Sequence, residues 1–156
     1  MENKIQTFIF SARSDALFIG NTLPPFINFL KKADSKITLI LDTRAPSGVL
    51  GSALTQSKLN DITDSIKNLQ SFLNFNFETA TYSLQSIRSK NRVQFNYPHK
   101  ETHCFRGYPI YGSFKQFFDN DADYILHLDC DMIFYESPEY SWINEGIKIM
   151  EQNEDI

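Results

Sequence analysis

The sequence lacks any long apolar run, and no segment reaches the roughly 18 consecutive apolar residues that a membrane-spanning helix needs. The first ten residues, MENKIQTFIF, also hold too short an apolar run for a secretory signal peptide. Cysteine is scarce: Cys104 and Cys130 are the two present, and no close pairing pattern joins them, which favours a reducing compartment. Together these absences predict a cytoplasmic protein without a transmembrane segment.

Positive charge is also in short supply. The chain carries 15 Lys and Arg against 19 Asp and Glu, a formal net charge of −4, and its basic residues do not cluster. A surface that binds nucleic acid needs such a cluster to neutralise phosphates, so we expect no nucleic-acid partner. An acidic ligand would have to be held by single basic groups, a helix N-terminus or a metal ion.

The remaining composition is that of a globular protein, with 42% hydrophobic residues and 14 phenylalanines in 156 residues. This length fits one ordinary domain, so we expect a single domain over residues 1–156. The last four residues, NEDI, follow a predicted helix and look like a turn into another strand. We therefore expect this domain to be the N-terminal portion of a longer chain, with a naturally short chain as the alternative.

Short runs rich in β-forming residues alternate with helical periodicities along the chain. Strands are predicted at 4–11, 36–42, 75–82 and 123–128. Helices are predicted around 22–30, 59–73 and 112–118, and from 137 onward. This alternation predicts an α/β fold: a three-layer sandwich with a mainly parallel, Rossmann-like sheet.

Local signals predict where two of the helices begin. Pro24 and Pro25 suit the first turn of their helix, where a missing N–H costs nothing; whether that helix extends further upstream is open. Ser137 is a good N-cap for the last helix, because a proline and then an acid follow it. The core-facing residues expected on that helix are Trp142, Ile143, Ile147 and Met150.

Polar and charged residues follow three of the predicted strands. They are Ser11–Asp15, Asp42–Arg44 and Asp129–Asp131. Ligands of parallel sheets bind outside the carboxyl ends of the strands, where the strand order switches. We therefore expect the strand ends at Ser11, Asp42 and Asp129 to meet in one cleft.

Asp129 and Asp131 flank Cys130 at the end of an apolar strand. Residues two apart in a strand point to the same side, so the two carboxylates repel each other unless a cation lies nearby. Mg²⁺ and Mn²⁺ prefer one or two carboxylates plus substrate phosphates, and the pattern predicts such a site. The alternative is a strand-end turn in which the aspartates bind local backbone N–H groups. Cys130 is expected to pack as a small hydrophobe.

The stretch ADYILHLDCDM resembles the strand and D-x-D motif of glycosyltransferases with the GT-A fold, especially those similar to family 2. FIFSARSDALFIGNTLPPFINFLKK resembles their first strand, nucleotide-contacting turn and first helix, and ITLILDTRAP resembles their second strand with its terminal Asp. The resemblance covers most of 5–50 and 105–152. It implies a metal-dependent, hexosyltransferase-like enzyme that moves a sugar from a UDP- or GDP-linked donor to an unknown acceptor.

The same resemblance implies nucleotide-sugar-binding roles for residues after the strands. Ser11 and Arg13 would line the nucleotide pocket, and Asp42 would bind the base or ribose. Arg106 stands in the polar region before the D-x-D strand and would also contact the nucleotide sugar.

The metal site follows from the D-x-D motif in the same way. Asp129 would contact the nucleotide sugar and, with Asp131, hold Mn²⁺ or Mg²⁺ on the diphosphate. The catalytic base of inverting members lies downstream of the D-x-D and is expected beyond Ile156, which leaves the activity of this chain alone open.

Two alternatives use the same residues differently, and a third concerns another part of the chain. A GT-A-like module could bind a nucleotide or a partner and catalyse nothing. A phosphatase resembling haloacid-dehalogenase relatives also uses a D-x-D, but its motif normally follows the first strand. His99 and His103 in HKETHC could begin a zinc site, but no second pair of ligands is evident in the sequence.

Overall fold

The computed structural model describes residues 5–31, 35–45, 47, 56–81, 83, 85–87, 89, 96, 103, 109, 111–115, 121–135 and 137–153. The strands are β1 (Ile5–Ala12), β2 (Lys36–Asp42), β3 (Asn76–Ala80) and β4 (Tyr124–Asp129). The helices are η1 (Arg13–Leu17), α1 (Ile19–Leu30), α2 (Gln56–Gln70), α4 (Tyr111–Lys115) and α5 (Trp142–Gln152). The predicted strands agree with the observed ones to within about two residues at each end.

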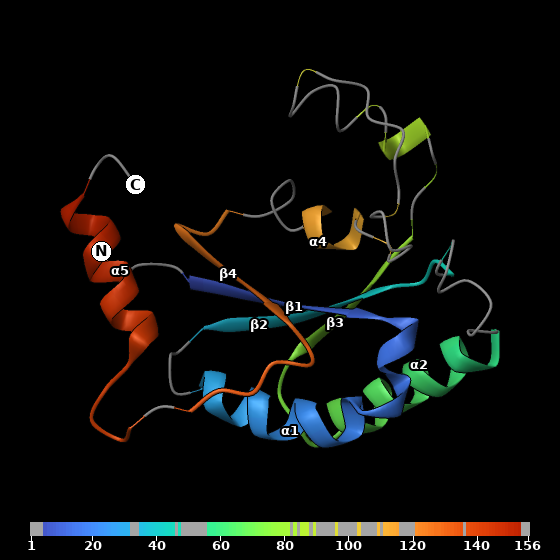
Figure 1. Ribbon diagram of the computed structural model, residues 1–156, viewed down its shortest axis with the longest axis horizontal. Coiled ribbons are helices and arrows are strands. Elements are labelled where there is room, and N and C mark those ends of the chain that lie inside the picture. Colours follow the sequence, from blue (N-terminus) through green and yellow to red (C-terminus); the bar gives the residue numbers. More distant parts are fainter. Residues whose placement is uncertain are drawn as a thin grey trace.

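The four strands form one parallel sheet in the order β3-β2-β1-β4 (Figure 1). β1 lies between two partners: Ala12 pairs with Asp42 of β2, and Phe10 pairs with Asp129 of β4. The chain adds β2 and β3 on one side of β1 and returns to add β4 on the other. The strand order therefore switches between β1 and β4, and the predicted α/β fold with a parallel, Rossmann-like sheet is confirmed.

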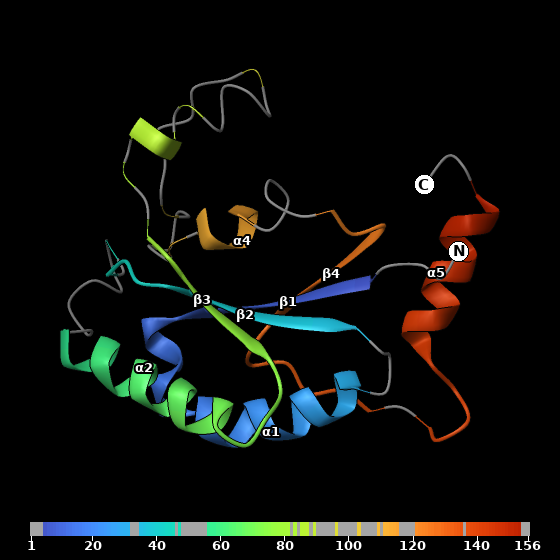
Figure 2. The same ribbon diagram turned by 180° about the vertical axis from the view of Figure 1, so that it is seen from behind.

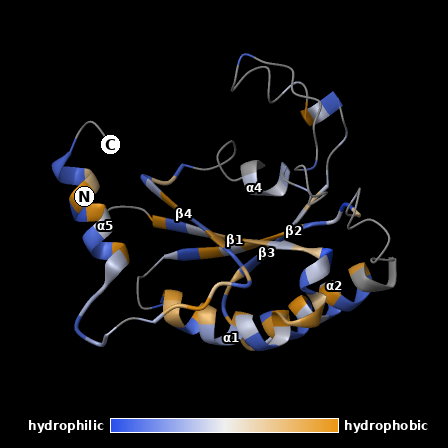
Figure 3. Ribbon diagram, viewed as in Figure 1, coloured by the Kyte–Doolittle hydropathy of each residue, from blue (hydrophilic) through white to orange (hydrophobic). Residues whose placement is uncertain are grey.

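Helices lie on both faces of this sheet. α1 and α2 lie on one face and α4 lies on the other (Figures 1 and 2). β2 is covered on both faces, and from Ile37 to Asp42 every one of its residues is buried. Parallel strands covered in this way are typically near-continuous apolar runs, as KITLILD is. In α1 and α2, apolar and hydrophilic residues alternate around each helix (Figure 3), which directs one apolar side to the sheet.

The main core fills the space between the sheet and the pair α1 and α2. Its fully buried members include Ile9, Leu23, Ile27, Leu39, Leu41, Ile62 and Ile66. A smaller cluster of Phe8, Ile40 and Ala80 lies on the opposite face of the sheet, because successive strand residues point to opposite faces and their neighbours Ile9, Leu39 and Leu41 belong to the main core. Leu73, predicted as part of a helix, lies beyond the end of α2 but is still buried in the main core.

The prediction for the two prolines was wrong by one turn. α1 begins at Ile19, directly after η1, so Pro24 and Pro25 lie in its second turn and not in its first. Neither proline can donate the helical hydrogen bond to the carbonyl four residues earlier. The helix persists because its buried face, which includes Leu23 and Phe26, packs in the main core.

The predicted start of the last helix was also wrong. The N-cap is Ser141, whose hydroxyl accepts a hydrogen bond from the Asn144 N–H at 3.4 Å. Ser137 instead begins a turn, in which its carbonyl accepts from the Tyr140 N–H at 3.2 Å. Ile143 is buried as predicted, whereas Met150 is 40% exposed, so its prediction as a core residue was wrong.

Candidate functional site

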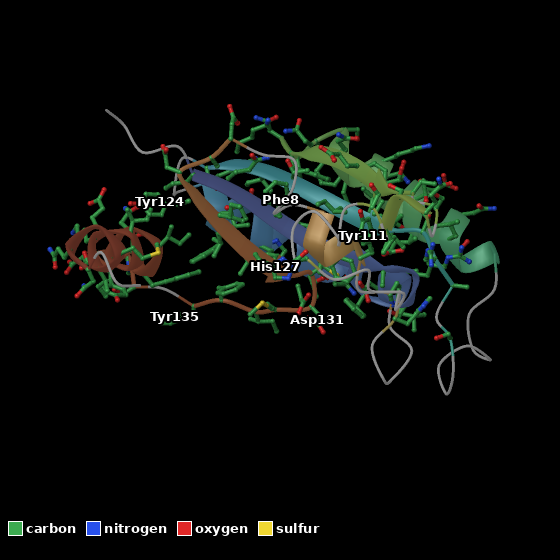
Figure 4. All side chains as sticks on the ribbon, turned by 90° about the horizontal axis from the view of Figure 1, so that it is seen from above. Phe8, Tyr111, Tyr124, His127, Asp131 and Tyr135 are labelled. Atoms are coloured by element: carbon green, nitrogen blue, oxygen red, sulfur yellow. The ribbon has the colours of Figure 1, made fainter. Side chains whose placement is uncertain are left out.

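A cavity of about 420 Å³ lies at the carboxyl ends of β1 and β4, where the strand order switches. Its lining residues are Phe10, Ala12, Ser14, Asp15, Phe18, Pro109, Ser113, Asp129, Cys130 and Asp131. Figure 4 shows Asp131 just beyond the end of β4. Both aspartates of the D-x-D motif thus lie in one cavity with the turn after β1, at the place where parallel sheets bind their ligands.

Negative charge accumulates in this cavity. The side chains of Asp129 and Asp131 are both exposed to solvent at its edge. Partial burial raises the pKa of the Asp129 carboxyl, nearby His127 lowers it, and the charges of Asp131 and Asp15 raise it further. A cation near Asp129 would offset the unfavourable effect of these neighbouring negative charges on its ionised carboxylate.

Asp15 is among the polar residues expected after β1, but no individual role was predicted for it. Its Oδ2 accepts hydrogen bonds from the Ala12 N–H at 2.7 Å, the Ser11 hydroxyl at 3.2 Å and the Cys130 thiol at 3.0 Å. Its Oδ1 accepts from the Ser14 hydroxyl at 2.9 Å. One carboxylate therefore ties the turn after β1 to the turn after β4.

One local signal could have identified part of this arrangement. An acid at the third position of a helix commonly reaches back to the N–H of the N-cap residue, and Asp15 does so in η1 by accepting from Ala12. The contact with Cys130 has no such signal, because it joins residues 115 positions apart.

Cys130 is buried and belongs to the main core, as its apolar surroundings predicted. It also lines the cavity, and its thiol donates to Asp15. Burial, and after it the charge of Asp15, raises the pKa of this thiol far above its usual value. Cys130 therefore stays protonated and serves as a hydrogen-bond donor between the two turns.

Asp42 ends β2 at the same edge of the sheet, but its side chain is fully buried and is not part of the cavity lining. Its Oδ2 accepts from the Gly112 N–H at 3.2 Å, and its Oδ1 accepts from the Arg44 N–H at 3.0 Å. A Cβ atom added at Gly112 would lie 2.8 Å from the ring of Phe10 and 3.2 Å from Asp42. Asp42 thus anchors α4 on the sheet, one strand away from the cavity.

The other predicted nucleotide-binding residues lie behind the cavity or outside the described residues. Ser11 is fully buried and donates to Asp15. The Arg13 guanidinium donates to the Thr43 carbonyl through Nε at 2.7 Å and also through Nη2, which joins the ends of β1 and β2. Arg106 falls outside the residues that the structure describes.

Within the described ranges, no three His, Cys, Asp or Glu side chains are arranged so that they could hold a metal ion. The site therefore does not fit a cation held by protein ligands alone. Asp129 and Asp131 are two exposed carboxylates of the cavity lining, and one or two carboxylates is the number that Mg²⁺ commonly takes from a protein when phosphate and water supply its other ligands. For the suggested zinc motif, His99 lies outside the described residues, and His103 Nε2 lies 3.0 Å from the Ala45 carbonyl oxygen.

Comparisons of the chain with protein-family models, with curated proteins and with solved structures find no match. In the part of the chain that the structure describes, every helix is too short or too polar to cross a membrane. Function must therefore be inferred from the chemistry of the cavity.

Proposed function

We propose that this chain is the donor-binding part of a metal-dependent glycosyltransferase with a GT-A-like fold. It would bind a UDP- or GDP-linked sugar for transfer to an acceptor. The observation that best supports this proposal is the position of Asp129 and Asp131 in one cavity at the switch in strand order. The volume of about 420 Å³ is within the roughly 300–1,000 Å³ of small-molecule sites.

In this proposal Asp129 and Asp131 hold the cation together with the donor diphosphate. When bound, Mn²⁺ or Mg²⁺ would neutralise the negative charge that develops on the departing nucleoside diphosphate. Ser14 and Ser113 bring hydroxyl groups to the cavity wall, and hydroxyls can donate hydrogen bonds to phosphate oxygens. Asp15 keeps the two turns at a fixed separation, so the donor meets a preformed site.

The roles of Ser11, Arg13 and Asp42 follow from their contacts. Each donates to or accepts from another part of the protein: Ser11 to Asp15, Arg13 to the Thr43 carbonyl, and Asp42 from Gly112. We propose that they support the walls of the donor site and do not themselves contact the nucleotide.

Calorimetric titration tests the proposal directly. The wild-type protein is titrated with UDP, GDP, ADP and CDP, in Mn²⁺ and in EDTA. We expect at least one nucleoside diphosphate to bind in Mn²⁺ and to lose most of its affinity in EDTA, because an uncompensated diphosphate is repelled by the carboxylates. Equal binding in EDTA would show that no metal bridge exists.

Two variants refine the titration. Asp131→Asn keeps the shape of the side chain but removes one charge, and should abolish most of the dependence on Mn²⁺. Asp121→Asn is the matched control, because this exposed aspartate precedes β4 at the end opposite the cavity. Equal effects of the two substitutions would contradict the role of the D-x-D motif.

A binding module without catalysis is the second candidate. It is favoured by the fact that the described residues offer no three-ligand metal group. Incubation with UDP- and GDP-sugars in Mn²⁺ distinguishes the two candidates, since a transferase slowly passes the sugar to water and releases nucleoside diphosphate. Release would exclude the module, whereas binding without release fits both candidates, because the catalytic base of inverting members is expected beyond Ile156.

A further inference from the structure

A second, smaller cavity of about 170 Å³ is lined by the residues that follow those of the first cavity in the chain. One wall of both comes from the chain after β1: Asp15 and Phe18 line the first cavity, and the following turns of α1 line the second. The opposite wall comes from the chain after β4, with 129–131 on the first cavity and 132–134 on the second. This chain runs beside α1 in the same direction (Figures 1 and 2). The two cavities are therefore lined by consecutive stretches of the same two segments, and we refer to them together as the furrow.

The two parts of the furrow differ in polarity. The first holds three carboxylates, whereas six of the residues that line the second are apolar: Pro25, Phe26, Phe29, Met132, Ile133 and Phe134. The Phe134 ring stacks on Phe26 and Phe29 with centroid distances of 5.0 and 5.5 Å, which fixes one wall of the second cavity. Asn21 and Thr22 are the polar residues in its lining.

Apolar side chains at the rim remain in contact with water. Ile133 is 91% exposed and Met132 is 40% exposed. Tyr135, farther along the same segment, is 93% exposed and lies outside the core (Figure 4). A ligand that covers this surface gains the free energy of removing apolar area from water.

We propose that the second cavity is a subsite for an apolar group, an aromatic ring or a short alkyl chain, carried by the acceptor. Its identification as an acceptor subsite depends on the proposed donor site beside it. The size suits such a group, since a dry apolar cavity of about 150 Å³ accommodates benzene. Because Asp131 and Met132 are consecutive, an acceptor anchored there would present its polar end to the acidic cavity.

Ligand-observed NMR with benzyl alcohol tests the subsite, in EDTA and without nucleotide, with glycerol as the polar control. We expect saturation transfer to benzyl alcohol and none to glycerol. Ile133→Asp should weaken benzyl alcohol binding at least about fivefold, because it places a charge at the rim of an apolar cavity. Phe72→Asp is the matched control, since Phe72 is 66% exposed and lines neither cavity, and it should leave binding unchanged. The absence of transfer, or equal losses in both variants, would overturn the subsite.

A second measurement connects the subsite to the donor site. Benzyl alcohol and a nucleoside diphosphate with Mn²⁺ should bind together, and competition between them would show that the apolar cavity is part of the nucleotide pocket. Benzyl alcohol binding without any nucleoside diphosphate binding would overturn both the proposed function and the assignment to an acceptor. Nucleotide binding without benzyl alcohol binding would overturn the subsite alone.

Discussion

Asp15 connects the two strand ends that form the acidic cavity, and its carboxylate is the acceptor for four groups. Asp15→Asn replaces one of its oxygens with an NH₂ group that cannot accept. The donors at Oδ2, Cys130 among them, then bond to a neutral oxygen and not to a carboxylate, which should lower the free energy of unfolding by about 1–3 kcal/mol. Urea denaturation measures this difference.

Asp64→Asn is a suitable control, because Asp64 is an exposed residue of α2. Its substitution should change the free energy of unfolding by no more than about 0.5 kcal/mol. If the two variants were equally stable, Asp15 would not hold the turns together.

The pKa of Asp129 determines a pH dependence with a definite sign. Since folding raises the pKa of the Asp129 carboxyl above its ordinary value, the ionised carboxylate destabilises the folded protein, and the free energy of unfolding falls as the pH rises from the ordinary pKa to the raised one. Asp129→Asn should therefore raise the melting temperature at pH 7 in EDTA, and the gain should disappear below about pH 4. Thermal denaturation at both pH values measures it; a gain that persisted at low pH would have another origin.

The residues also show how far the sequence alone could lead. The placement of Asp129 and Asp131 at the end of an apolar strand was predictable, because strand periodicity and the switch-point rule are local and topological signals. The buried partners of Asp42 and Cys130 were not, since these contacts join residues 70 and 115 positions apart. The position of an aspartate at a strand end does not show whether its carboxylate accepts hydrogen bonds within the protein, as that of Asp42 does, or lines the cavity, as that of Asp131 does.

Among the elements, α4 depends on a single close approach to the sheet. Gly112→Ala would place a Cβ atom 2.8 Å from the Phe10 ring, so it should displace α4 and cost about 1–3 kcal/mol of stability. Gly146→Ala is the control, because a Cβ atom there meets nothing within 4 Å. In the interior of α5 it should instead stabilise the protein by roughly 0.5–1 kcal/mol. Chemical denaturation of both variants measures the change in the free energy of unfolding, which should be negative for Gly112→Ala and positive for Gly146→Ala.

Element boundaries were predicted less well than the elements themselves, for a tertiary reason. Ser137 and Ser141 both carry acceptable N-cap side chains, and only Ser141 is used. Trp142 stacks on Phe29 and Phe134 with centroid distances of 6.4 and 5.6 Å, which fixes the beginning of α5 against α1. Such packing cannot be read from a local cap signal.

At the scale of the whole molecule, ligand binding and folding stability are linked. A ligand that binds only the folded protein should add about 2.7 kcal/mol at one hundred times its Kd. For the proposed donor site, that gain should appear with a nucleoside diphosphate and Mn²⁺ together, and should be absent in Asp131→Asn. Differential scanning calorimetry measures it; an equal shift from the nucleotide alone would contradict the metal bridge.

The position of β1 at the centre of the sheet has a consequence for biosynthesis. β1 leaves the ribosome before the other three strands of the sheet, but one of its two edges is covered only when β4 has been made. Until then the nascent chain presents unpaired N–H and C=O groups along that edge, a known starting point for association between chains. Translation must therefore pass Asp129 before this edge is protected, and the D-x-D motif is complete two residues later, at Asp131. A messenger cut short before that codon would yield an aggregation-prone product.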